Sequence, residues 1–176
     1  MGRTNEWRSE FRDLSVILTP CNRKGRACHI IVRMIQAHSH TIQVEDDLSA
    51  VGRAQEELTS LWGQYSLPEE TENAVSLALE EVLSNVLRHS RTDGRSSEIR
   101  VTFTIDDCGF QFEVSDSAAP YNPLLRPDPP VDLPLEQRQA GGLGVFLVRR
   151  LADELSYDRR DGRNVLRFRK LFPPEL

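Results

Sequence analysis

Three polar side chains on one predicted helix have the types and spacing needed for nucleotide chemistry. Glu81, Asn85 and His89 recur every four residues, so at about 100° per residue they form one line along a helix. The amide oxygen of an asparagine is a hard ligand of the kind that Mg²⁺ accepts together with phosphates and water. A carboxylate one turn away can orient or deprotonate an attacking hydroxyl group. The same spacing is common on the solvated edge of an amphipathic helix, so these residues alone do not establish a function.

A glycine-rich turn, Gly141-Gly142-Leu143-Gly144, precedes an apolar stretch with helical spacing. Glycine lets the backbone approach a ligand closely, and a helix start offers free N–H groups and a positive dipole end to a phosphate. No Gly-Lys-Ser/Thr sequence follows, so the turn is not a Walker A loop. A flexible loop end would show the same glycines, which makes this motif weak when it is considered alone.

Asp116 is the third candidate, because it stands where a predicted strand ends. An ionised carboxylate only accepts hydrogen bonds, and it could accept one from the exocyclic amine of adenine. An Asx-type turn that ends the strand is the alternative explanation. The order of the candidates favours function, because the acid/amide helix, the strand ending in Asp, a long loop and the glycine turn follow one another within residues 81–144.

The elements that must position these residues follow from the periodicity of the apolar side chains. Periods of two and 3.6 residues predict the order strand, helix, helix, strand, strand, loop, helix, strand, strand. Two short turns, Asp106–Gly109 and Asp161–Gly162, predict hairpins. The order predicts an α+β two-layer sandwich with helices on one face of a mixed, mainly antiparallel sheet. The predicted strands lie at about 42–44, 99–105, 110–114, 154–160 and 163–171, and the helices at about 48–65, 68–89 and from 144 onward.

Length and composition fit one domain without a membrane segment. The chain has 176 residues, no apolar run near the ~18 residues of a membrane span, and no signal-peptide pattern. We therefore expect a cytoplasmic protein with no membrane partner. Three cysteines without a CxxC pair argue against a disulfide framework or a zinc site.

The charge is unevenly distributed along the chain. Residues 1–40 hold seven Arg or Lys against three acids, which leaves a net charge of −9 on the remainder. An acidic domain is a poor candidate for direct nucleic-acid binding, because phosphate contacts need clustered basic side chains. It would suit a basic protein partner instead.

Residues 1–39 show no sustained period, and we expect a poorly ordered basic extension ahead of a domain at 40–172. His38 and His40 form an HxH pair without an acidic or Cys/His neighbour, so we expect them to be solvated. A further hypothesis is that translation starts at Met34, since clean patterning begins at Thr41. The intact mass of the natively expressed protein tests that hypothesis.

Taken together, these motifs resemble those of the GHKL-type (Bergerat-fold, histidine kinase-like) ATPases, and among them the anti-sigma regulatory serine kinases of the RsbW and SpoIIAB kind. Residues 78–89 are similar to that family's N box, 114–123 to its first glycine box and 141–151 to its second. The closing stretch 161–170 is similar to its last hairpin. The resemblance covers about 41–172, and the second glycine box with its following helix is the most specific part.

The resemblance implies Mg-ATP as the cofactor and a role for each matched residue. Asn85 would be the Mg²⁺ ligand, and Glu81 the catalytic acid/base. Asp116 would contact the adenine amine, while Gly142 and Gly144 would bring backbone amides to the phosphates. The remaining nucleotide-binding residues implied in this way are His89, Gly141 and Leu143.

The resemblance also implies a partner-switching function. The domain would sequester a sigma factor, and it would phosphorylate a serine of an anti-anti-sigma (STAS-type) protein. The proline-rich loop 117–140, which holds six of the ten prolines, would be an ATP lid that orders around bound nucleotide. A homodimer is expected as well.

One position departs from the family pattern, and it leaves an alternative open. The family's first glycine box usually contains the sequence Asp-x-Gly, and here Asp116 is followed by Ser117 and by Ala118 in the place of the glycine. Alanine fits where the backbone φ is negative and otherwise costs about 1 kcal/mol or more. The alternative function is therefore a catalytically weak or inactive module that binds nucleotide, or only a protein. A histidine phosphorelay kinase is disfavoured, because no two-helix hairpin with a phosphoacceptor His precedes the domain.

Overall fold

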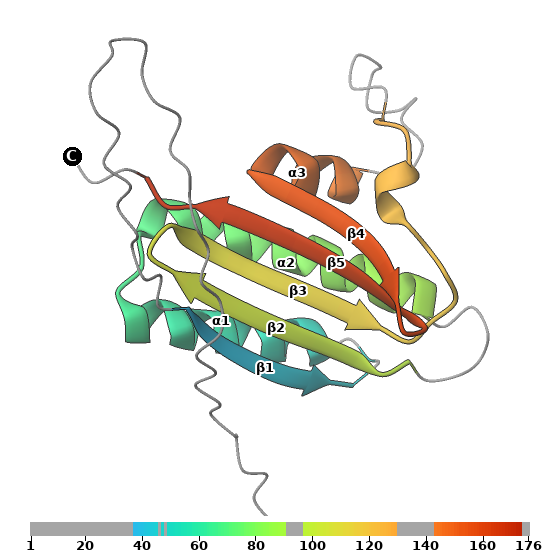
Figure 1. Ribbon diagram of the computed structural model, residues 1–176, viewed down its shortest axis with the longest axis horizontal. Coiled ribbons are helices and arrows are strands. Elements are labelled where there is room, and N and C mark those ends of the chain that lie inside the picture. The colour runs from blue at the N-terminus through green and yellow to red at the C-terminus, as the bar shows by residue number, and fades with distance from the viewer. Residues whose placement is uncertain (1–36, 46, 48, 91–96, 130–142, 174–176) are drawn as a thin grey trace, which may run out of the picture.

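The computed structural model describes residues 37–173 except 46, 48, 91–96 and 130–142, and it shows one sheet with helices packed on one face (Figure 1). In the described residues the sheet has five strands in the order β1-β2-β3-β5-β4. The element order and the α+β two-layer fold predicted from the sequence are confirmed. The strands are β1 (His38–Val44), β2 (Ile99–Asp106), β3 (Gly109–Asp116), β4 (Glu154–Arg160) and β5 (Arg163–Leu171), and the helices are α1 (Ser49–Tyr65), α2 (Glu69–Ser90) and α3 (Leu143–Leu151).

All the strand pairings in the described part are antiparallel, so the parallel component that the sequence suggested is not seen there. Hairpins join β2 to β3 and β4 to β5. Two helices, α1 and α2, connect β1 to β2. After α2 the chain returns to the C-terminal end of β1, where β2 begins. As a result Val44 at the end of β1 pairs with Ile99 at the start of β2.

The core lies between the inner face of the sheet and the two long helices. Alternate residues of β2 and β3 point into it, and Phe103, Phe110 and Phe112 are almost fully buried. Phe112 stacks on Phe168 of the neighbouring strand with ring centroids 4.8 Å apart. The α2 helix carries acidic residues in its first turn and Arg88 in its last, and these charges interact favourably with the two ends of the helix dipole.

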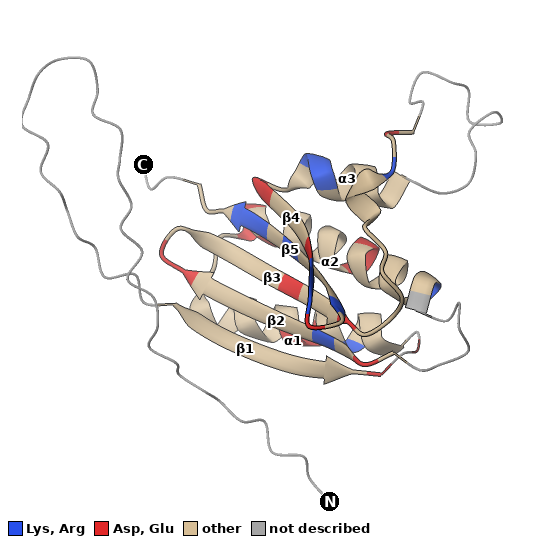
Figure 2. Ribbon diagram, turned by 45° about the vertical axis from the view of Figure 1, so that its right-hand side comes forward, with Lys and Arg blue, Asp and Glu red and all other residues tan. Residues whose placement is uncertain are grey.

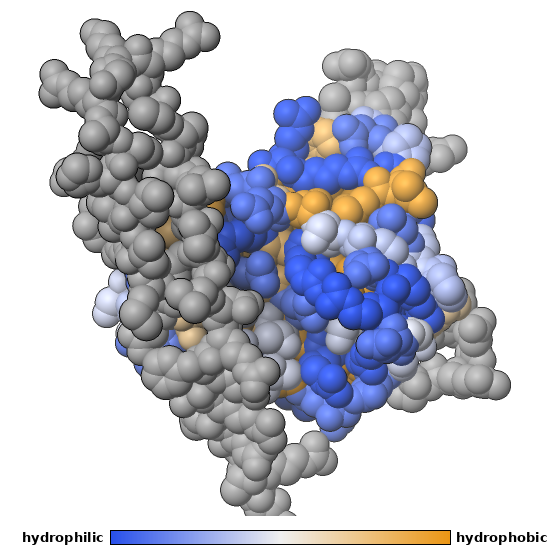
Figure 3. All heavy atoms as spheres, in the orientation of Figure 1, coloured by the Kyte–Doolittle hydropathy of each residue, from blue (hydrophilic) through white to orange (hydrophobic). Residues whose placement is uncertain are grey.

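The opposite face of the sheet is polar and carries cross-strand ion pairs. Figure 3 shows the part of this face that is not covered by grey atoms as largely hydrophilic, and the ribbon in Figure 2 marks charged residues on several strands. Arg167 of β5 pairs with Glu113 of β3 at 2.7 Å, and Arg169 pairs with Asp106 at 2.8 Å. The alternation of apolar and polar residues along β3 places Asp116, at the end of the strand, on the inner face with Phe112 and Val114.

The start of the domain differs from the sequence expectation. Strand β1 begins at His38, inside the stretch 1–39 that was predicted to be a poorly ordered extension. His40 is buried rather than solvated, because it alternates onto the inner face and its Nε2 lies 2.8 Å from Glu57 of α1. The rest of the predicted extension, with Met34, lies outside the described residues. No helix in the described ranges is both long and apolar enough to cross a membrane.

Candidate functional site

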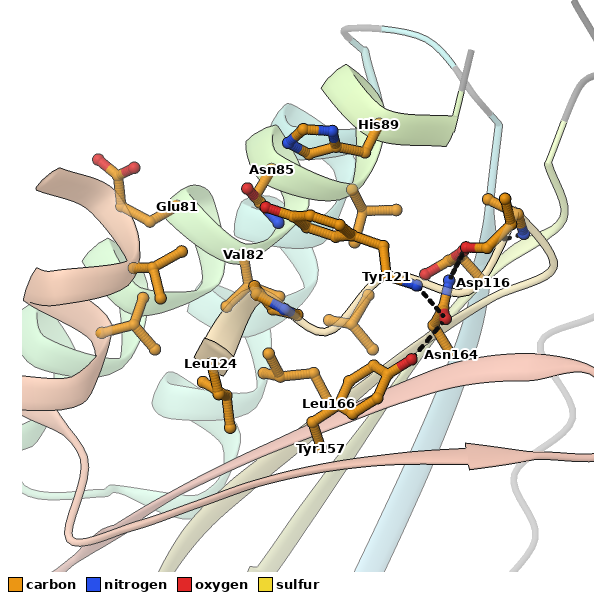
Figure 4. Close-up of a pocket in the computed structure, with 17 residues that line it drawn as sticks. Glu81, Val82, Asn85, His89, Asp116, Tyr121, Leu124, Tyr157, Asn164 and Leu166 are labelled. Atoms are coloured by element: carbon orange, nitrogen blue, oxygen red, sulfur yellow. Dashed lines mark hydrogen bonds between the residues drawn. The ribbon is translucent and has the colours of Figure 1, made fainter. Parts of the chain in front are cut away.

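A pocket partly open to solvent lies between α2, α3, the C-terminal end of β3 and the N-terminal end of β5 (Figure 4). The space within it, including the open solvent at its mouth, is about 580 Å³. Aliphatic side chains form most of its wall, and a few polar groups converge on it. Such a combination is typical of a small-molecule site. The apolar lining includes Val82, Val86, Val114, Leu124, Val145, Val148 and Leu166, and the polar lining comprises Glu81, Asn85, His89, Asp116, Tyr121, Tyr157 and Asn164.

Helix α2 supplies the three residues that the sequence singled out first. Glu81, Asn85 and His89 all line the pocket and are half-buried. Val82, beside Glu81, is only 5% exposed. The polar line therefore runs along the margin of the buried stripe, as the helical spacing predicts, and one side of α2 presents a carboxylate, an amide and an imidazole in succession (Figure 4).

Glu81 also touches the start of α3. A Cβ placed on Gly144 would lie 2.1 Å from Glu81 Oε2 and 3.0 Å from its Cδ, so only glycine leaves room for the carboxylate in this position. The N-terminus of a helix carries a partial positive charge, which stabilises a nearby carboxylate. The contact therefore places a negative group and a helix N-terminus side by side at one end of the pocket.

The glycine turn is described only in part. Gly141 and Gly142 lie outside the described residues. Leu143 is the first residue of α3 and is 51% exposed, and neither it nor Gly144 is among the residues that line the pocket. In the described part of the turn, the structure thus brings Gly144 against Glu81 and leaves Leu143 facing outward.

Asp116 ends β3 inside the pocket, and it is 5% exposed. Its Oδ1 accepts hydrogen bonds from the backbone N–H of Ala118 at 3.0 Å and from Asn164 Nδ2 at 2.8 Å. Its Oδ2 accepts no hydrogen bond from the described residues. Ala118 is not among the residues with positive φ, which in the described non-glycine part are Ser66 and Asp161. The Asx turn and the pocket wall form here without the glycine that the family pattern has, and without backbone strain.

Asn164 is a site residue that the sequence reasoning missed. It is 6% exposed, and its Oδ1 accepts from the Tyr157 hydroxyl at 2.8 Å and from the Tyr121 N–H at 3.2 Å. Its position signalled it, because the Asp161–Gly162 turn fixes the hairpin register and places Asn164 in line with the inward-facing Leu166 and Phe168. A polar residue at a core-facing strand position requires internal partners.

Tyr121 is the second residue that the sequence reasoning missed. Its ring stacks on His89 with centroids 4.2 Å apart, and Figure 4 shows its hydroxyl directed toward Asn85. That hydroxyl is buried and has no hydrogen-bond partner within the described part of the chain. Burial, followed by the positive charges of Arg126 and Arg88, holds the pKa of His89 below its usual value. His89 therefore favours its neutral form.

The segment after Tyr121 is fastened to α3. Pro123–Leu125 forms a short 3₁₀ helix, η2, and Arg149 of α3 donates hydrogen bonds to the carbonyl oxygens of Leu124 and Arg126. Arg149 also pairs with Asp128. The described beginning of the predicted lid, 117–129, is thereby held beside the pocket, while 130–140 lies outside the described residues.

Comparisons with known proteins agree with this architecture. A family model for the histidine kinase-like ATPase domain matches residues 44–170. Serine/threonine-protein kinase BtrW of Bordetella bronchiseptica is 33% identical over 101 residues, which cover 57% of this chain and 71% of that protein. Serine-protein kinase RsbW of Oceanobacillus iheyensis is 25% identical over 124 residues, which cover 64% of this chain and 73% of that protein.

A solved structure shares the fold. The crystal structure of the RsbU and RsbW domains of Rv1364c from Mycobacterium tuberculosis matches with a TM-score of 0.54 at 15% identity, and the match covers 77% of this chain but 33% of that one. The present chain thus spans about a third of that longer protein, and the likeness concerns the fold. The range that the family model matches, 44–170, contains every described residue that lines the pocket. The chain belongs to the family of histidine kinase-like ATPase domains.

Proposed function

We propose that this protein is an ATP-dependent protein-serine kinase that also acts as an anti-sigma factor in a partner-switching pathway. The observation that carries the proposal is the pocket, which gathers Glu81, Asn85 and Asp116 against a largely aliphatic wall. Its family uses ATP, and two relatives at 33% and 25% identity are named serine/threonine- and serine-protein kinases.

The base end of the pocket fits adenine. Val114 and Leu166, both nearly buried, offer apolar surface to a flat ring. Asp116 Oδ1 is occupied by two donors from the protein, which leaves Oδ2 to accept from the exocyclic amine of adenine. A carboxylate with one oxygen already saturated presents a single acceptor, and the amine supplies the matching donor.

The phosphate end fits Mg²⁺ and a polyphosphate. Asn85 would hold the metal through its amide oxygen, and the buried hydroxyl of Tyr121, which has no partner in the described residues, points toward the same place. In the family pattern the backbone at Gly141, Gly142, Leu143 and Gly144 would face the phosphates. Here Gly144 lies against Glu81, outside the pocket lining, and the Leu143 side chain is exposed. When bound, Mg²⁺ neutralises phosphate charge and organises the transferring group.

Glu81 would orient the attacking serine hydroxyl of the substrate protein and accept its proton. It lies at the phosphate end, in contact with Gly144 at the start of α3. His89 would border the base and ribose side, because it lies a turn beyond Asn85 and stacks on Tyr121. Glu81, Asn85 and His89 would thus lie in this order along the nucleotide, from the transferred phosphate through the metal to the ribose and base.

The partners in this proposal are a sigma factor and a STAS-type anti-anti-sigma protein whose serine is phosphorylated, with a homodimer as the assembly. The protein would act in the cytoplasm, without direct nucleic-acid binding and without a membrane partner. The net charge of −9 on the domain supports a basic protein partner. Exchange between partners requires that each nucleotide state binds them with different affinity.

The alternative is a catalytically weak or inactive module that binds nucleotide, or only a protein, and it has no support from the backbone at Ala118. Its motive was the strain that alanine suffers at positive φ, and Ala118 is not in that region. The methyl group lines the pocket next to Asp116 and leaves the carboxylate hydrogen-bonded.

The first test is thermal unfolding with ATP or ADP, in Mg²⁺ and in EDTA, on wild type and Asn85→Ala. Ligand at about 100 times its Kd adds about 2.7 kcal/mol, which shifts Tm by several degrees in a domain of this size. The matched control is Asn73→Ala, which removes an exposed amide of the same helix. A Mg-dependent shift that only Asn85→Ala abolishes supports the site, and no shift at millimolar nucleotide contradicts the proposal.

Phosphate transfer to a STAS-type protein then tests the catalytic assignment. Glu81→Ala should abolish transfer, because no other carboxylate is placed at this end of the pocket among the described lining residues. Glu80→Ala is the control, since its neighbouring carboxylate is exposed and outside the pocket. Unchanged transfer by Glu81→Ala would remove Glu81 from the mechanism.

A further inference from the structure

The loop that follows β3 is fastened to the β4–β5 hairpin by two side chains. Arg159 Nη1 donates to the carbonyl oxygen of Ala118 at 2.9 Å and to Asn164 Oδ1 at 2.8 Å. Asn164 Nδ2 donates to the carbonyl oxygen of Ala119 at 3.0 Å, and its Oδ1 accepts from the Tyr121 N–H at 3.2 Å. Three backbone groups of the loop are thereby satisfied by Arg159 and Asn164 rather than by strand pairing.

The hairpin turn sets the geometry of this clamp. Arg159 and Asn164 are directly opposite in the β4–β5 register. Between them, Asp161 and Gly162 have φ of 50° and 76°, the pair of positive values that a tight two-residue hairpin turn requires. Asn164 is in turn directly opposite Asp116 on β3. The turn therefore sets the register that places Arg159 and Asn164, which we call the clamp, beside Asp116 at the end of β3.

The amide of Asn164 can adopt only one orientation. Its oxygen faces a guanidinium, which only donates, and its nitrogen faces the Asp116 carboxylate, which only accepts. If the amide were reversed, its NH₂ group would face the Arg159 guanidinium, which is also a donor, and its oxygen would face the Asp116 carboxylate, which is also an acceptor. The Asn164 amide, fixed in this way, holds the Asp116 carboxylate: Oδ1 accepts two hydrogen bonds, and Oδ2 accepts none from the described residues.

We propose that Arg159 and Asn164 are positioning residues that set the preference of the pocket for adenine over guanine. This inference rests on the proposed nucleotide function. Adenine presents an amine donor at its C6 position, whereas guanine presents a carbonyl acceptor there and two donors on the adjacent N1 and N2. A fixed Asp116 with a single free oxygen matches the adenine amine. A carboxylate released from the clamp could turn both oxygens to the N1 and N2 donors of guanine.

The clamp also explains how alanine replaces glycine at position 118. The neighbouring backbone conformation is fixed from outside by Arg159 at Ala118 and by Asn164 at Ala119. Conformational freedom at position 118 is then not needed to bring the loop against the base. The loop backbone at this point is held by side chains of the β4–β5 hairpin.

The test measures the dissociation constants of ATP and GTP, with Mg²⁺, for wild type, Arg159→Leu and Asn164→Ala. We expect ATP binding to weaken by about tenfold or more in both variants, as for loss of hydrogen bonds around a charged group, and the preference for ATP over GTP to fall by about tenfold. The control is Arg160→Leu, because Arg160 is the next residue of the same strand and bonds only to the exposed Asp158 within the described residues. It should keep the wild-type ratio.

Amide hydrogen exchange in the ligand-free protein provides a second measurement. The Tyr121 N–H, which donates to Asn164, should exchange faster in both variants and as in wild type in Arg160→Leu. Should Asn164→Ala fail to fold, Arg159→Leu decides, since Arg159 is only half-buried. Folded variants with a wild-type ATP-to-GTP ratio and unchanged exchange would overturn the inference and leave the nucleotide site intact. A wild-type protein that binds neither nucleotide would overturn the proposed function itself, and this inference with it.

Discussion

Replacing Gly144 by alanine should separate the stability of this protein from its phosphate transfer. The new Cβ would lie 2.1 Å from Glu81 Oε2, more than an ångström closer than ordinary van der Waals contact. The atom in the way is the far end of a flexible side chain, and the Gly144 backbone is not in the positive-φ region. The substitution therefore moves the Glu81 carboxylate and leaves the helix intact.

The expected change in the free energy of unfolding is small, whereas the expected change in the rate of phosphate transfer is large. Alanine is favoured over glycine within a helix by about 0.5–1 kcal/mol, while forcing a side chain from its rotamer costs about 0.5–1.5 kcal/mol. These contributions nearly cancel, so the free energy of unfolding should stay within about 1 kcal/mol of wild type. A positioned general base contributes about 10²–10⁴-fold to rate, so transfer should fall by about a hundredfold or more if Glu81 has that role.

The assay is single-turnover transfer from ATP to a STAS-type acceptor, together with urea unfolding and the ATP dissociation constant. Gly63→Ala is the matched control, because Gly63 also lies in a helix and a Cβ there meets nothing within 4 Å. That variant should be slightly more stable and fully active. If Gly144→Ala transfers phosphate at the wild-type rate, the Glu81 carboxylate seen against Gly144 is not the catalytic arrangement.

Two further predictions concern the base end of the pocket. Burial, followed by Arg126 and Arg88, keeps the pKa of His89 below its usual 6.5, so the unfolded chain takes up this proton first and stability falls as the pH drops through about 6.5. His89→Gln should therefore lose less Tm than wild type between about pH 7.5 and 5.5, and parallel profiles would contradict this assignment. Ala118→Gly should lower stability by about 0.4–1 kcal/mol through the unfolded chain without tightening ATP binding, and a lower dissociation constant for ATP would show that the methyl group obstructs the base.

Much of this fold could be predicted because its signals are local. The apolar period of α2 placed Glu81, Asn85 and His89 on one line, and the Asp161–Gly162 turn fixed the last hairpin within a residue of its position. Local patterns also located the end of β3 at Asp116. Each of these depends on neighbours within a few residues, which the sequence displays directly.

The rest depends on pairings between segments far apart in the sequence. The link from Asn164 to Asp116 spans 48 residues, and no local pattern states which strands are adjacent. His40 was misjudged for the same reason, since its partner Glu57 belongs to a helix that only packs on β1 after folding. The contact of Gly144 with Glu81 likewise arises from how α3 meets α2.

The two ends of the pocket are built differently, and this bears on how nucleotide could control partner choice. At the base end, Asp116 and Asn164 are buried within the sheet and bonded to each other, so this end should be the same with ATP and with ADP. At the phosphate end, α3 meets α2 through a glycine and a flexible carboxylate, and the γ-phosphate is the only group by which the two nucleotides differ. A ligand shifts an equilibrium only through interactions that differ between the two states. In the function proposed above, a switch between partners would therefore originate at the phosphate end, where Gly144 meets Glu81, and not at the base end.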